Sequence, residues 1–120
     1  MDVERELGKL KYHVKLLGSA IDWRENPTAA MVIQLDWSEE DLDRAEDIFE
    51  KYDQLLENDR SIHGLEKELK DTFGIGYQTV KTIILGFWRN SQFPDVCVEY
   101  AKQNEASEFR EILKEARNPA

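Results

Sequence analysis

The apolar residues of this chain recur at spacings of three and four along almost its entire length, which is the period of an α-helix. The short apolar run 29–35 fits the same interpretation, because only Val32 and Ile33 in it are β-branched. Short polar turns separate the periodic segments. The pattern therefore predicts an all-α fold, a compact bundle of six to seven short helices that forms a single domain over residues 1–120.

The first of these segments carries a narrow apolar stripe with the spacing of a heptad repeat. Its members are Leu7, Leu10, Val14, Leu17 and Ile21. A stripe of this kind can pack inside its own bundle, which is the interpretation we favour. It can also pair with a second copy of itself, which would make the protein a homodimer.

The clearest helix start lies at Ser38. The side chain of Ser38 can accept the backbone N–H of Asp41, whose carboxylate can reach back to form a capping box. Trp37 before the cap and Leu42 after it have the spacing of a hydrophobic staple. We therefore expect a helix to begin within about two residues of Ser38.

The net charge of the chain is concentrated in this same helix. Residues 36–59 contain eleven acids and two bases, a balance of −9, which equals the net charge of the whole 120-residue chain. The acids on the outward side of the helix at 38–57 are Asp43, Glu46, Asp47, Glu50, Asp53 and Glu57. They can form a solvated face, or a surface that binds a basic protein partner together with Trp37, or, less plausibly, a metal site.

Residues 62–90 resemble a helix-turn-helix pair, with Gly74 in the turn and apolar Val80 and Ile83 in the second helix. A DNA-binding regulator would use residues 65–89 for recognition. The residues expected to contact DNA are Tyr77, Gln78, Thr79, Lys81 and Arg89. The local charge of +2 is small for this purpose, so DNA binding is the alternative rather than the preferred hypothesis.

The sequence offers little for catalysis. His13 and His63 lie in different segments without motif-spaced partners, and Gly74-x-Gly76 is only a fragment of a phosphate loop. Cys97, the single cysteine, follows an apolar residue and is expected to be buried and inert. We therefore predict that the protein is not an enzyme and uses no cofactor or metal.

Other features indicate the cellular location of the protein. A single cysteine suits a reducing compartment, and the N-terminal residues lack a signal-peptide pattern. No apolar run is long enough to span a membrane. These observations predict a cytoplasmic protein.

Several segments together resemble the small, uncharacterised helical proteins typified by YhaI of Bacillus. The likeness covers about residues 5–100 and rests on Leu7, Leu10, Tyr12, Leu16 and Leu17, on Asp22 and the run Pro27 to Leu35, on Ser38-Glu39-Glu40, and on Thr82-Ile83 with Gln92-Phe93. The chain departs from the pattern at Asn90-Ser91, where a Gln-Gly turn is expected, and in its extra C-terminal helix. The resemblance implies a helical bundle without known catalytic residues, and it carries no function.

Together these features predict a non-enzymatic interaction domain whose acidic helix 38–57 binds a basic protein. Its most concrete form is an inhibitor, an immunity protein or an antitoxin.

Overall fold

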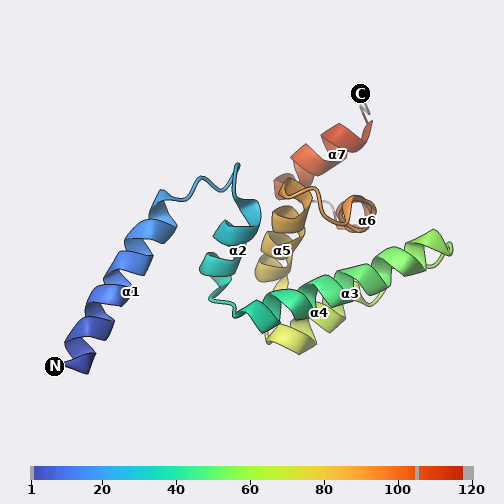
Figure 1. Ribbon diagram of the computed structural model, residues 1–120. Helices are drawn as coiled ribbons and strands as arrows, with labels where there is room; N and C mark the ends of the chain where they lie inside the picture. The colour runs from blue at the N-terminus through green and yellow to red at the C-terminus, as the bar shows by residue number, and fades with distance from the viewer. Residues whose placement is uncertain (1, 105, 118–120) are drawn as a thin grey trace.

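A computed structural model describes residues 2–104 and 106–117. Over these residues the chain forms seven α-helices and one 3-10 turn, without a strand, which confirms the predicted all-α fold (Figure 1). The elements are α1 (Val3–Ala20), α2 (Pro27–Leu35), α3 (Glu39–Glu57), α4 (Leu65–Phe73), α5 (Tyr77–Arg89), α6 (Pro94–Gln103), η1 (Ser107–Phe109) and α7 (Arg110–Arg117).

Helices α2 to α7 pack around one apolar core. Phe49 of α3 lies in it fully buried, with its ring centroid 4.5 Å from that of Phe87 on α5 and 5.6 Å from that of Phe93. Buried residues of α4, α6 and the C-terminal segment complete the core, among them Leu65, Leu69, Val96, Phe109 and Ile112. The helices of this body are therefore held by the apolar faces that the periodicity predicted.

The start of α3 agrees with the sequence in detail. Asp41 donates its backbone N–H to the Ser38 hydroxyl at 3.1 Å, and Ser38 donates its N–H to the Asp41 carboxylate at 2.9 Å. The predicted capping box is thus present and α3 begins one residue after Ser38. Helix α2 begins with Pro27 at its first position, and the side chain of Asn26 before it makes no capping bond.

Two helix contacts depend on glycine. A Cβ atom at Gly86 of α5 would lie 2.5 Å from the sulfur of Met31, so the missing side chain allows α2 to pack tightly on α5. A Cβ atom at Gly18 of α1 would lie 3.1 Å from Cγ2 of Ile33 on α2. Close approach at these two positions fixes how α2 sits between α1 and the body.

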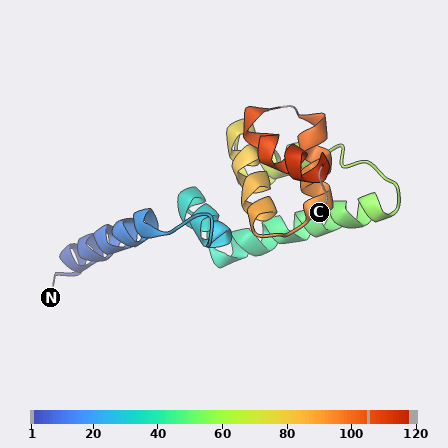
Figure 2. The same ribbon diagram turned by 90° about the horizontal axis from the view of Figure 1, so that it is seen from above.

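Helix α1 does not join the core. None of its described residues is buried, and Figure 2 shows it extending away from the body formed by the other helices. The molecule is accordingly elongated, 59 × 30 × 20 Å along its principal axes. The favoured sequence interpretation, that the stripe of α1 packs inside its own bundle, was wrong, because the linker at residues 21–26 directs α1 along α2 and away from the core.

Candidate interaction surfaces

The acidic face of α3 consists of Asp43, Glu46, Asp47, Glu50, Asp53 and Glu57. Four of these residues are exposed, and Glu46 and Asp53 are half-buried. No ion pair among the described residues involves any of the six carboxylates. Glu46 accepts a hydrogen bond from Nε2 of Gln92 at 3.2 Å, which is a neutral partner. The charge of this surface is therefore not compensated by contacts within the described chain.

The basic residues of α3 do little to offset the negative charge of this surface. Lys51, one of the two bases in residues 36–59, points across to α4 and forms an ion pair with Glu68. The same Glu68 oxygen accepts the Tyr52 hydroxyl at 3.0 Å. Lys51 thus contributes to the α3–α4 contact.

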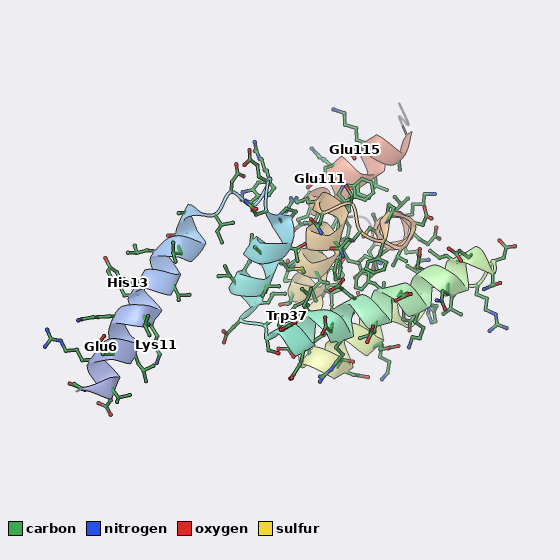
Figure 3. All side chains as sticks on the ribbon, in the orientation of Figure 1. Glu6, Lys11, His13, Trp37, Glu111 and Glu115 are labelled. Atoms are coloured by element: carbon green, nitrogen blue, oxygen red, sulfur yellow. The ribbon has the colours of Figure 1, made fainter. Side chains whose placement is uncertain are left out.

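Trp37 packs within the protein to a greater extent than an exposed anchor would. Its ring is half-buried and stacks on Phe73 of α4, with centroids 4.8 Å apart and planes inclined by 27°. It lies just before the N-terminal end of α3 (Figure 3). Packing alone accounts for the position of Trp37, and its contact with a partner stays a prediction.

The predicted helix-turn-helix pair exists, because α4 and α5 are joined by the short turn 74–76. The two basic residues in the set expected to contact DNA, Lys81 and Arg89, are nevertheless paired with other groups of the chain. Lys81 is only 6% exposed, and its Nζ lies 3.0 Å from a carboxylate oxygen of Glu108 and 5.0 Å from the centroid of the Tyr77 ring. Lys81 is therefore held by contacts within the chain, and its contact with DNA stays a prediction that these contacts do not support.

Arg89 is engaged in the same way. Its guanidinium forms a 2.6 Å ion pair with Glu111 of α7 and lies 4.3 Å from the centroid of the Trp23 ring. Gln78 remains exposed, whereas Thr79 and Tyr77 are half-buried. Both basic groups are paired with carboxylates of the C-terminal segment, which weakens the positive face that non-specific DNA binding requires and gives the regulator alternative no support.

A surface that the sequence did not reveal lies between α1 and α2. It is a groove of about 750 Å³ whose apolar lining includes Val14, Ile21, Trp23, Met31 and Ile33. Ile33 and Trp23 are each 45% exposed. The sequence did contain one signal for this groove, the apolar content of residues 29–35. A helix that is apolar on nearly all sides packs against two neighbours rather than one.

The groups considered for chemistry lie apart from one another. Cys97 is buried as predicted, with its thiol 3.5 Å from the carbonyl oxygen of Ile84, and burial raises the pKa of the thiol to about 12. His13 lies on α1 and His63 precedes α4, and both are exposed. Within the described part of the chain, no cluster of three or more potential ligands could hold a metal ion. None of the described helices is long and apolar enough to cross a membrane.

The region that carries both α1 and the acidic face also matches a known sequence family. The model of a family described as a protein of unknown function, DUF1878, matches residues 1–73. The chain belongs to this family. Its likeness to YhaI itself stays a prediction. No curated protein and no solved structure matches the chain. The matched residues include α1 through α4, whereas α5 to α7 lie outside the match.

Proposed function

We propose that this DUF1878 member is a non-enzymatic protein-interaction domain whose acidic face binds a basic protein partner. The observation that carries the proposal is that six carboxylates on one side of α3 form no ion pair within the described chain. The most concrete form of this role is an inhibitor, an immunity protein or an antitoxin that covers a cationic site on its target.

The cost of this arrangement supports a functional role. Asp43 and Asp47, and likewise Glu46 and Glu50, are spaced four residues apart, where like charges destabilise a helix by about 0.2–0.5 kcal/mol per pair. A basic surface placed against the helix converts this repulsion into attraction and also accelerates association. A merely solvated face would gain nothing from concentrating the acids.

The extent of the acidic face fits a protein better than a single cation. Asp43 and Glu57 are fourteen residues apart on one helix, which corresponds to about 21 Å along its axis. A metal ion needs several oxygens at about 2–2.6 Å from one point. Carboxylates that are spread along a helix instead match a row of lysine or arginine side chains.

The experiment begins by identifying partners in an affinity pull-down with the wild-type chain, followed by purification of the basic candidates. The test variant is Asp43→Asn, Asp47→Asn, Glu50→Gln. A matched control changes the net charge by the same amount outside α3, with Glu25→Gln, Glu99→Gln and Glu115→Gln. None of these three glutamates forms an ion pair in the described structure.

We expect the test variant to associate with the partner at least about tenfold more slowly at low ionic strength, with the difference shrinking as salt is added. The control should retain most of the wild-type rate, because its charges lie outside the interface. Circular dichroism should show that both variants remain folded. If the partner binds the test variant at the wild-type rate, or if both variants slow association equally, the acidic face is only a solvated surface.

A further inference from the structure

Helix α1 carries an apolar seam that the rest of the described chain leaves mostly exposed. The seam consists of Val3, Leu7, Leu10, Val14, Leu17 and Ile21, six positions that alternate at spacings of four and three. Leu7, Leu10 and Leu17 are 49%, 57% and 67% exposed. An isolated helix of about this length is marginal in water, since most helical stability comes from packing an amphipathic face. The 18 residues of α1 therefore need a surface to pack against.

The side of the seam toward α2 is partly occupied, and the other side is open. Val14, Gly18 and Ile21 line the groove that α1 forms with α2, whereas Leu10 and Leu17 lie outside it. A second helix laid along α1 can therefore reach Leu10 and Leu17 without displacing α2. Figure 1 shows that the other elements of the body leave the length of α1 free.

We propose that two copies of the chain associate through their α1 helices as a parallel two-stranded coiled coil. In the heptad register that the seam defines, Leu7 and Val14 occupy a positions and Val3, Leu10 and Leu17 occupy d positions, while Ile21, at the next a position, is the extended C-cap of α1. The a residue Val14 is β-branched and two of the three d residues are leucine. This distribution favours two parallel strands.

The charges that flank the seam select the parallel orientation. Glu6 falls at a g position and Lys11 at an e position five residues later. In a parallel pair, Glu6 of each copy faces Lys11 of the other, which gives two opposite-charge contacts across the interface. An antiparallel pair with full overlap instead places Lys11 opposite Lys11 and His13 opposite His13. Of the two arrangements, only the parallel one places opposite charges against each other across the seam.

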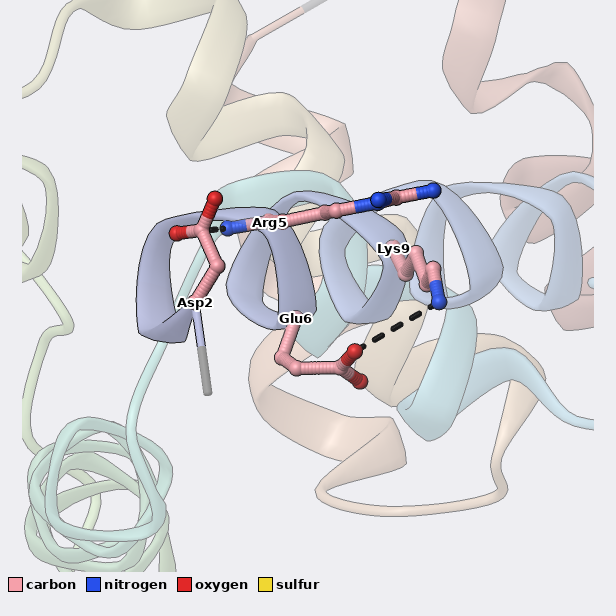
Figure 4. Close-up of polar contacts among 4 residues, drawn as sticks. All are labelled: Asp2, Arg5, Glu6 and Lys9. Atoms are coloured by element: carbon pink, nitrogen blue, oxygen red, sulfur yellow. Dashed lines mark hydrogen bonds and ion pairs between the residues drawn. The ribbon is translucent and has the colours of Figure 1, made fainter.

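Contacts within one copy leave this pairing possible. Glu6 and Lys9 form a 3.4 Å ion pair on the surface of α1, and both side chains are more than half exposed (Figure 4). An exposed ion pair of this kind contributes little to stability, so Glu6 can exchange Lys9 for another partner. Glu6 and Lys11 lie on opposite flanks of the seam, so they do not neutralise one another within one helix. Each is free to meet the second copy.

The first experiment measures the molar mass of the full chain by sedimentation equilibrium. We expect a dimer of twice the 14.1 kDa chain mass that persists in concentrated salt, because its core is apolar. Leu10→Glu with Leu17→Glu should produce a monomer. The matched control is Leu16→Glu, which introduces the same side chain on the opposite face of α1 at a residue that is 48% exposed, and it should remain dimeric.

A wild-type monomer would overturn the proposal, as would loss of the dimer in Leu16→Glu to the same degree. A dimer that dissociates in concentrated salt and survives Leu10→Glu with Leu17→Glu would overturn it too. That result would indicate contact between basic side chains of α1 and the acidic face of α3. None of these three outcomes depends on whether the acidic face binds a foreign protein.

The second experiment tests the orientation. Glu6→Lys should weaken the dimer at least about tenfold, and adding Lys11→Glu should restore it, although the Glu6–Lys9 ion pair is lost in both variants. Leu10→Cys should form an intermolecular disulfide on mild oxidation, because identical d residues face one another in a parallel pair and the native Cys97 is buried. Failure of the charge swap to restore the dimer, or of Leu10→Cys to cross-link, would overturn the parallel arrangement.

Discussion

The hydrogen bond between Tyr100 and Glu66 offers a quantitative test of how α6 is held against α4. The Tyr100 hydroxyl donates to Oε1 of Glu66 at 2.6 Å, and the residue is 2% exposed. Its ring also packs edge-on against Phe109 with centroids 5.7 Å apart. Tyr100→Phe keeps this ring packing and removes only the hydroxyl, so the measured loss of stability reports the hydrogen bond.

The expected loss of unfolding free energy depends on the donor, Tyr100, and on the acceptor, Glu66. A hydrogen bond to a charged group contributes about 1.5–3 kcal/mol. The Glu66 side chain is 36% exposed and can regain water when the hydroxyl is gone. We therefore expect the lower end, about 1.5 kcal/mol. With an unfolding entropy of about 2.1 cal/mol/K per residue, this loss corresponds to a fall in Tm of about 6 °C.

Tyr52→Phe provides the matched comparison. The Tyr52 hydroxyl donates to Glu68 at 3.0 Å, and Lys51 pairs with the same carboxylate oxygen. Among the described residues, Glu66 keeps only Lys70, which contacts its other oxygen, Oε2, at 3.4 Å, whereas the Glu68 oxygen that loses Tyr52 keeps Lys51. Tyr52→Phe should therefore cost less, about 0.5–1 kcal/mol. Both variants are compared with wild type by urea unfolding at one protein concentration, since self-association would make stability concentration-dependent. A loss in Tyr100→Phe that is no larger than in Tyr52→Phe would refute this account of the two contacts.

The same contacts and three other sites yield further predictions. Burial, followed by the hydrogen bond to Glu68, raises the pKa of Tyr52 to about 12, and burial likewise raises the pKa of Tyr100. Stability should therefore be full below the unfolded value of about 10 and be lost as pH rises above it, and Tyr52→Phe should flatten that loss in urea unfolding at alkaline pH. Phe49→Ala should cost about 3–5 kcal/mol in the same assay, because it empties the centre of the core. Ser38→Ala should cost about 1 kcal/mol by removing the cap of α3, and an unchanged midpoint would show that the capping box contributes nothing. Cys97 should react with a thiol reagent only at the rate of unfolding, so fast labelling of the native protein would contradict its burial.

The sequence by itself determined which segments are helical and where the strongest boundary lies. Helical period, glycine and proline are local signals, and Ser38 with Asp41 specified the start of α3 through contacts three residues apart. The outward placement of the acids on α3 was predictable for the same reason, since residues that share a helix face are fixed by the 3.6-residue repeat. The all-α class, the burial of Cys97 and the acidic face follow from such local rules.

Only the tertiary structure decided what each helix packs against. In the alternative hypothesis Lys81 and Arg89 face DNA, but Glu108 and Glu111 reach them from a segment that lies 27 and 22 residues further along the chain. Likewise, the periodicity of α1 is the same whether its seam packs inside one chain or between two copies. A pattern along one helix identifies an apolar face, whereas the partner of that face depends on how the linkers direct helices that are distant in sequence.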